Sequence, residues 1–189
     1  MKMRVTLFVL AVVLLGNLAG VARAADVPSS PVYNPESKSY FQLFSDNTHP
    51  GTWVAARERA HSKFFKGVRG RLAQVRSAET HEFLLRTFGL NNPRLDVWIG
   101  LRYWCRLRML QWEDERPFSP SDPDEFRIWH APWERDVEEP GGSCGMTGSR
   151  QQGFAPVYYR TLSGITLWQA VGAAKFFDYY LVEFPTGEE

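Results

Sequence analysis

Helix-like and strand-like patterns occupy different parts of this chain of 189 residues. Apolar residues recur every three or four positions in two segments before residue 90, whereas short aromatic and β-branched runs prevail after residue 96. A parallel α/β sheet would need helices and strands to alternate along the chain. The separation therefore predicts an α+β fold with antiparallel strands.

Both predicted helices begin at a capping residue. The first follows Thr52 and extends to Gly67. The second follows Ser77, has Glu79 in its first turn, where the helix dipole favours an acid, and ends at Gly89. The apolar stripe of the first helix consists of Trp53, Ala56, Ala60 and Phe64. Each helix can therefore cover part of a sheet.

Strands are predicted for six short runs, with regular structure beginning near Ser39. Ser163 and Gly164 join two of these runs as a hairpin. The segment 113–139 contains ten acids, four prolines and little apolar periodicity, so we expect a long loop region there. The predicted strands are residues 40–44, 97–101, 126–129, 157–162, 165–168 and 179–184.

The charge balance bears on the class of partner. The chain has 22 basic and 21 acidic residues, a formal net charge of +1. Residues 1–24 hold three basic residues and no acid, so the rest carries 19 − 21 = −2. Nucleic-acid binding depends on a basic excess. No nucleic-acid partner is therefore expected.

The N-terminus has the pattern of a secretory signal, with a basic start, an apolar run over residues 5–15 and small residues before Ala25. We expect cleavage after Ala24, so residues 1–24 are a signal peptide and the mature protein is secreted or periplasmic. The apolar run is shorter than the ~20 residues that span a bilayer. An uncleaved anchor is the alternative, and no later stretch could span a membrane. Residues 25–38, with three prolines, are expected to form a linker.

Cys105 and Cys144 are the two cysteines of the chain. In an oxidising compartment a disulfide between them is favoured. Two unrelated buried thiols are the alternative.

The acids of the long loop suggest two interpretations. They could converge on Ca²⁺, which takes oxygen ligands. They could equally form a solvated acidic surface, because their spacing matches no known ligand pattern. The acids concerned are Asp122, Asp124, Glu125, Glu134, Asp136, Glu138 and Glu139.

The order of the elements, together with several short motifs, resembles the C-type lectin-like domain over residues 39–185, which leaves 186–189 as a tail. Trp98-Ile99-Gly100-Leu101 is one of these motifs. The resemblance implies two helices flanking antiparallel sheets, with a long loop region. It also places Trp98, Trp112, Trp129 and Trp168 in the core. The other matching motifs are residues 52–56, 70–75, 110–114, 126–129, 139–141 and 180–185.

The cysteines depart from the family pattern. Val182 stands where the last strand usually carries a cysteine, whose partner would lie near Ala60 or His61. Ala173 stands where Cys144 would normally find its own partner. The resemblance places Cys144 at the start of another strand of the upper sheet. A bond between Cys144 and Cys105 would then tie the loop region at its base.

The two triplets that hold calcium and sugar in typical members also differ. In their places stand Glu139-Pro140-Gly141 and Trp168-Gln169-Ala170. Gly141 and Ala170 have no side-chain oxygen, and a cation that takes six to eight oxygens does not easily lose two ligands. We therefore expect no cofactor, and calcium-dependent folding or binding is disfavoured.

The resulting prediction is a carbohydrate-binding domain whose ligand surface is the loop region 104–148 with the Trp168-Gln169 segment. A protein-interaction module on the same fold is the alternative. No catalytic motif is present, so an enzyme is not expected. Glu113, Asp114 and Glu115 could in principle form a carboxylate pair, but adjacent acids in a charged loop are usually solvated. The predicted ligand-binding residues are Trp104, Trp133, Glu134, Asp136, Glu139 and Gln169.

Overall fold

The two ends of the domain meet in one sheet. The computed structural model describes residues 28–46, 49–113, 117–119, 122–123, 125–129, 137–138 and 140–188. Strand β1 (Val32–Asn34) pairs with β2 (Ser39–Ser45), which pairs in turn with the last strand, β10 (Tyr179–Phe184). Beyond β10, the Gly187 amide donates to the Lys38 carbonyl over 2.9 Å. Regular structure therefore begins at Val32, and the expectation that it begins near Ser39 is wrong because β1 finds a partner in β2.

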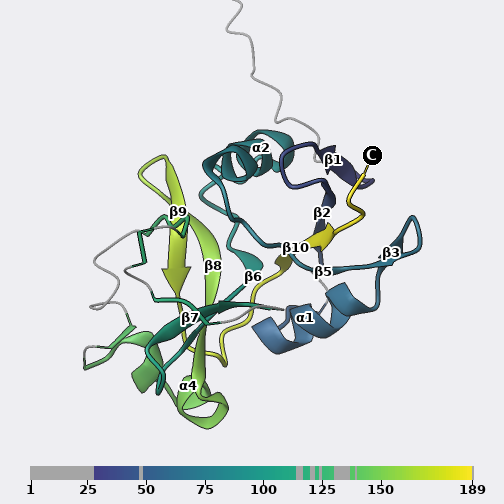
Figure 1. The fold of residues 1–189 in the computed structure, drawn as a ribbon. Helices are drawn as coiled ribbons and strands as arrows, with labels where there is room; N and C mark the ends of the chain where they lie inside the picture. Colours follow the sequence, from purple (N-terminus) through teal and green to yellow (C-terminus); the bar gives the residue numbers. More distant parts are fainter. Residues whose placement is uncertain are drawn as a thin grey trace, which may run out of the picture.

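The rest of the sheet is built around β6 (Val97–Trp104). β7 (Met109–Trp112), β8 (Phe154–Leu162) and β9 (Ile165–Ala170) continue from it with antiparallel pairing, whereas β10 pairs with β6 in parallel. Short β5 (Arg71–Leu72) joins β10. The strand order is β1-β2-β10-β6-β8-β9, so the α+β class is confirmed with one parallel pair (Figure 1).

Helix α2 (Ala78–Phe88) has the predicted ends. Its N-cap Ser77 accepts a hydrogen bond from the Thr80 amide, and Gly89 closes the helix with a left-handed backbone. Leu84 and Phe88 point into the core. The capping residues and the apolar stripe were therefore sufficient to predict both ends of α2 from the sequence.

Helix α1 (Trp53–His61) starts as predicted at Thr52, which accepts from the Ala55 amide. It does not reach Gly67, because Ser62 caps it and the chain turns back in a hairpin. Strands β3 (Phe64–Phe65) and β4 (Val68–Arg69) form that hairpin, with Lys66 and Gly67 at its turn. Phe64 was predicted on the buried stripe of the helix but is 65% exposed.

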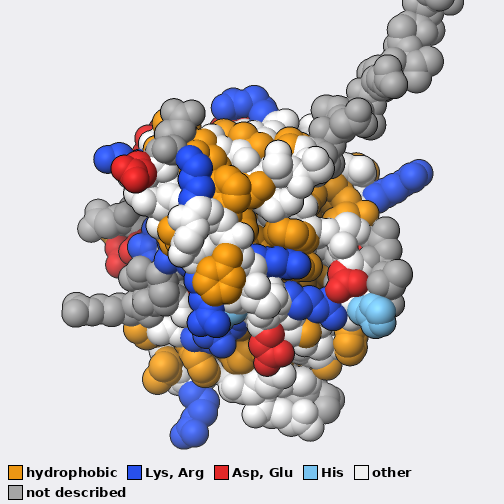
Figure 2. All heavy atoms as spheres, turned by 90° about the vertical axis from the view of Figure 1, so that its right-hand side faces the viewer, with side chains coloured by type: hydrophobic (Ala, Val, Ile, Leu, Met, Phe, Trp, Pro, Cys, Tyr) orange, Lys and Arg blue, Asp and Glu red, His pale blue; other side chains and the backbone are white. Residues whose placement is uncertain are grey.

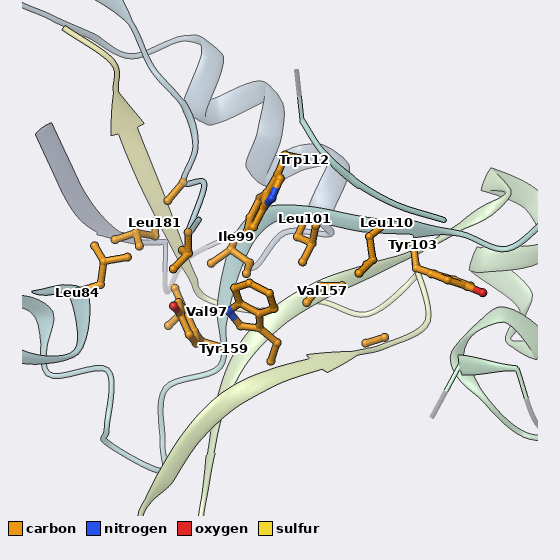
Figure 3. Packing of buried hydrophobic residues seen from close by; sticks show 14 of the residues in the cluster. Leu84, Val97, Ile99, Leu101, Tyr103, Leu110, Trp112, Val157, Tyr159 and Leu181 are labelled. Atoms are coloured by element: carbon orange, nitrogen blue, oxygen red, sulfur yellow. The ribbon is translucent and has the colours of Figure 1, made fainter. Parts of the chain in front are cut away.

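The core combines aliphatic and aromatic side chains (Figure 3). Trp98, Trp112 and Trp168 are fully buried, as predicted, and the rings of Trp112 and Trp168 meet edge to face at 5.5 Å. Trp129 is partly buried and packs against Trp168 at 5.2 Å. Its segment, 126–129, was expected to be a strand but forms only a single bridge to Trp168.

Apolar packing occupies the place of a missing family disulfide. Ala60 and Val182 are both completely buried in one cluster. Gly70 lies between them: a Cβ added to it would lie 2.7 Å from the Ala60 oxygen and 2.8 Å from a Val182 methyl carbon. Helix α1, which contains Ala60, and strand β10, which contains Val182, therefore approach closely without a covalent link.

The second half also contains helical turns that the sequence did not indicate. Cys144 lies in the 3₁₀ turn η1 (Ser143–Gly145), not at the start of a strand, and α4 (Thr147–Gln152) follows directly. The expectation of two helices confined to the first half is therefore wrong. Both elements lie in a segment with many glycine and serine residues and no apolar period.

Among the described residues, no helix is long and apolar enough to cross a membrane. The predicted signal peptide, residues 1–24, lies outside the described residues.

Candidate ligand-binding site

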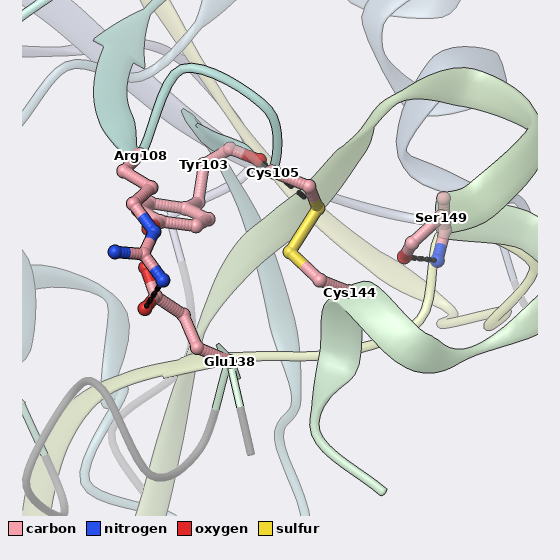
Figure 4. The surroundings of a disulfide bond; sticks show 7 residues. Tyr103, Cys105, Arg108, Glu138, Cys144 and Ser149 are labelled. Atoms are coloured by element: carbon pink, nitrogen blue, oxygen red, sulfur yellow. Dashed lines mark hydrogen bonds and ion pairs between the residues drawn. A yellow bond between two sulfur atoms is a disulfide. The ribbon is translucent and has the colours of Figure 1, made fainter. Parts of the chain in front are cut away.

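A disulfide holds the two sides of the loop region together (Figure 4). Cys105, just after β6, is bonded to Cys144 in η1, with their Cα atoms 5.7 Å apart. Glu138 accepts a hydrogen bond from the Tyr103 hydroxyl and pairs with Arg108 at 3.1 Å. The structure thus contains the predicted pairing, and a second, ionic contact fixes the neighbouring segment to the β6–β7 hairpin.

Ala173 stands where the resemblance implies a cysteine partner for Cys144, and a hydrogen bond connects it to α4. Ala173, which is buried, donates its amide hydrogen to the Ser149 hydroxyl over 3.0 Å. Gly148 packs closely against Ala174, because a Cβ added to Gly148 would lie 2.4 Å from the Ala174 backbone nitrogen. Helix α4 is therefore fastened to the chain beyond β9 without a disulfide.

A hollow of about 810 Å³ lies between these two segments. One wall is residues 140–143 with Met146, and the other is residues 170–172 with Ala174 and Lys175. Of the four glycines that line the hollow, Gly141 has open space where a side chain would be, whereas Met146 covers Gly172. A volume of this size suits a small-molecule ligand.

Three polar side chains on the β8–β9 hairpin form the centre of the hollow. Tyr158 and Gln169 are direct cross-strand partners. The Gln169 side-chain oxygen accepts from the Tyr158 hydroxyl at 3.1 Å and from the Arg160 guanidinium at 3.1 Å. Because residues two apart on a strand share a face, Tyr158 and Arg160 both reach Gln169. The amide nitrogen of Gln169 makes no hydrogen bond to a described residue.

Charged and aromatic groups surround this centre. Asp96 lies in the hollow, where burial raises the pKa of its carboxyl above the ordinary value and the positive charges of Arg160 and Lys175 oppose that rise. Phe177 forms part of the floor, with its ring 4.6 Å from Tyr158 and 4.4 Å from Trp98. Hydrogen-bond donors, hydrogen-bond acceptors and an aromatic ring thus line the same hollow.

Comparison with known proteins identifies the fold. The sequence model of the lectin C-type domain matches residues 50–155, more than half of the chain. The chain belongs to this family. C-type lectin domains are in general binding modules and not enzymes.

Three solved structures share the fold at low sequence identity. Human lithostathine is 17% identical, with 83% of this chain and 89% of that chain covered and a TM-score of 0.56. The C-type lectin CEL-I from Cucumaria echinata is 16% identical, covering 84% and 96%, with a TM-score of 0.54. The C-type lectin domain of murine dendritic cell inhibitory receptor 2 is 15% identical, covering 82% and 96%, with a TM-score of 0.54. No curated protein matches the sequence.

The described residues of the two triplets offer few oxygen ligands for calcium at this hollow. Gln169 offers one side-chain oxygen, and that oxygen already accepts from the cationic Arg160. Gly141 and Ala170 offer no side-chain oxygen. A second positive ion beside a guanidinium is repelled, and hard cations need several oxygen ligands. Among the described residues, no three His, Cys, Asp or Glu side chains gather as a metal site.

The structure describes two of the predicted ligand residues, and one of them lies in the hollow. Gln169 lines it. Trp104 does not: its ring nitrogen donates to Gln111 at 2.8 Å and its ring packs edge-on against Phe154. The other four lie outside the described residues, and they are Trp133, Glu134, Asp136 and Glu139.

Glu113, one member of the carboxylate pair considered for catalysis, has a structural environment. Its side chain is buried, pairs with Arg57 at 2.8 Å and with His61, and accepts from the Leu72 amide at 2.9 Å. The general expectation that adjacent acids in this loop are solvated is wrong for Glu113. Asp114 lies outside the described residues.

The sequence analysis missed Phe177 and four polar or charged residues of the hollow: Asp96, Tyr158, Arg160 and Lys175. The sequence contained a signal for Tyr158 and Arg160, which lie on the same strand. The predicted turn at Ser163 and Gly164 fixes the hairpin register, and that register places Tyr158 opposite Gln169. Asp96 and Lys175 come from segments without a regular pattern, and only the tertiary fold brings them there.

Proposed function

We propose that this C-type lectin domain binds carbohydrate directly in the hollow, without calcium. The observation that carries the proposal is the cluster of Tyr158, Arg160 and Gln169 inside a hollow of about 810 Å³. Sugar hydroxyls both donate and accept hydrogen bonds. The Gln169 amide nitrogen and the Arg160 guanidinium would donate to them, and the Asp96 carboxylate would accept.

The walls of the hollow support a flat, polar ligand. Gly141 presents no side chain and has open space at that position, so a sugar ring could approach the backbone closely there. Phe177 and Tyr158 supply aromatic surface at the floor, and aromatic rings pack against the apolar side of sugars. Two similar structures agree with this ligand class: CEL-I is a C-type lectin, and the murine receptor domain was crystallised with an N-glycan.

The predicted contacts of Trp133, Glu134, Asp136 and Glu139 remain part of the proposal. In the sequence they lie at the end of the long loop region, and Pro140, the residue after Glu139, lines the hollow. Trp104 is a weaker candidate because its ring nitrogen is already bonded to Gln111. We expect Trp133→Ala to weaken glycan binding more than Trp104→Ala.

The test is a glycan array probed with the purified mature domain in a chelating buffer. We expect saturable binding to a defined glycan, weakened about tenfold by Gln169→Ala through the loss of directed hydrogen bonds. Arg86→Gln, an exposed change on α2, is the matched control and should bind like the wild type. An array without signal, combined with one specific protein in a pulldown, would instead establish the alternative of a protein-interaction module.

A further inference from the structure

A second surface, remote from the hollow, carries an uncompensated positive charge. Residues 57–76 include seven Lys or Arg and one acid, Glu58, although the chain as a whole is nearly neutral. Figure 1 places the β3–β4 hairpin on the opposite side of the molecule from β9 and α4. Figure 2 faces that side and shows Lys and Arg side chains gathered around hydrophobic ones in its centre.

Three cations of the hairpin region have no carboxylate partner among the described residues. Lys63 lies 4.9 Å from the centre of the Phe44 ring. Lys66 lies over Tyr40 and donates to its hydroxyl at 2.7 Å. Arg69 donates to the His61 carbonyl at 2.8 Å. These contacts orient the cations without neutralising them.

The acids nearest to this region are already compensated. Glu113 is buried and paired with Arg57, and Glu183 is buried and paired with Arg71 at 3.1 Å. Glu183 also accepts from the Ser39 hydroxyl and the Gln74 amide. Glu58, which is exposed, offsets one positive charge, so the three hairpin cations still leave this surface with a net positive charge.

An exposed aromatic ring stands among these cations. Phe64 is 65% exposed and is the cross-strand partner of Arg69, whose guanidinium lies 5.9 Å from the ring centre. Phe65 faces the other way and packs on Tyr40 and Phe184, which anchors the hairpin to the body. An apolar side chain is thus held in solvent by a rigid support.

We propose that Lys63, Phe64, Lys66 and Arg69, the hairpin surface, bind an anionic lipid bilayer. Cations attract the negative headgroups, and each Lys or Arg near such a surface strengthens binding about fivefold. Phe64 would enter the interfacial layer, where aromatic and apolar side chains gain by leaving water. A soluble polyanion would use the cations but would leave Phe64 without a role. With the hairpin on the bilayer, the hollow would face away from it.

The test is sedimentation of the mature domain with vesicles of phosphatidylcholine alone or mixed with phosphatidylglycerol. We expect binding to the mixed vesicles only. The triple variant Lys63→Gln, Lys66→Gln, Arg69→Gln should weaken it by about a hundredfold, as three contributions of about fivefold multiply. The control variant Arg86→Gln, Arg106→Gln, Arg150→Gln removes the same charge from exposed positions elsewhere and should bind within a few-fold of the wild type. Thermal unfolding curves identify any variant that fails to fold.

Phe64→Ser distinguishes a bilayer from a soluble polyanion. A clear loss of vesicle binding with unchanged binding to heparin would support the proposal. Equal vesicle binding by wild type and Phe64→Ser, retention on heparin without vesicle binding, or equal binding by the two triple variants would overturn it. None of these results depends on whether the hollow binds a glycan.

Discussion

The body of the domain and the loop half around the hollow are stabilised in different ways. In the body, Ala60, Gly70 and Val182 pack tightly where the family usually has a disulfide. In the loop half, the Cys105–Cys144 bond, the Ser149–Ala173 hydrogen bond and the contacts of Glu138 connect segments with few apolar side chains. The comparison shows that the tight apolar packing of the body needs no covalent link, whereas the loop half combines its packing with a disulfide and hydrogen bonds.

Removing a large side chain from the body should have the largest effect. Trp98 is fully buried, packs on Phe177 and donates to the Gly51 carbonyl at 2.9 Å. Trp98→Ala should lower the free energy of unfolding by about 3–5 kcal/mol. Urea denaturation followed by circular dichroism measures it. Trp104→Ala, at a partly buried position at the end of β6, is the matched comparison, and an equal loss for both variants would contradict the greater weight given to the fully buried ring.

Loss of the disulfide should rank second and should act mainly on the loop half. In the chain-entropy account the Cys105→Ala, Cys144→Ala variant loses about 2–4 kcal/mol. We expect faster hydrogen exchange around η1 and α4, with the amides of β6 and β10 still protected. Hydrogen exchange read by mass spectrometry separates the regions. A uniform rise across the sheet would show that the bond supports the whole domain.

A methyl group added inside the body should cost less than either change. In Gly70→Ala the new Cβ would be forced against the Ala60 carbonyl and Val182, which we expect to destabilise the domain by about 1–3 kcal/mol. Gly145→Ala is the control, since nothing lies within 4 Å of an added Cβ there. The difference between the two melting temperatures gives the result, and equal values would mean that the body is less tightly packed than described.

A dependence on pH should be the smallest of these effects. Burial lowers the pKa of His81 below 6.5, although Glu82 opposes this, and its ring nitrogen contacts the Tyr159 hydroxyl at 2.9 Å. As the pH falls through 6.5, the unfolded chain binds the proton before the folded one does, so the free energy of unfolding decreases.

Denaturation curves at several pH values between neutral and mildly acidic conditions test this. His81→Gln should flatten the dependence, whereas His49→Gln, at an exposed position, should leave it unchanged. The opposite sign, with greater stability at lower pH, would contradict the role given to burial.

Local signals explain what could be predicted from the sequence. Ser77 and Gly89 defined α2 because capping is a property of a few neighbouring residues. The stripe that included Phe64 continued the helical period past Ser62, and only the β3–β4 pairing shows that the chain turns there. Apolar periodicity indicates which face of a helix could be buried, but it does not indicate the residue at which the helix ends.

The candidate site was harder to predict because it is assembled from distant segments. Gln169 could be placed by the family resemblance, and Tyr158 by the hairpin register. The positions of Asp96 and Lys175 depend on how β6 and the chain after β9 pack, which no short motif encodes. The burial of Glu113 likewise depends on Arg57 and the Leu72 amide, which are far away in sequence.

The central claim is that Arg160 and Gln169 bind the sugar directly, with no metal between them. Its most direct test is isothermal titration of the array-identified glycan in millimolar calcium and again in excess chelator. We predict equal dissociation constants within about twofold in the two buffers, since the Gln169 oxygen is already bonded to a cation and hard ions need several oxygen ligands. Loss of binding in chelator, restored by added calcium, would contradict the account.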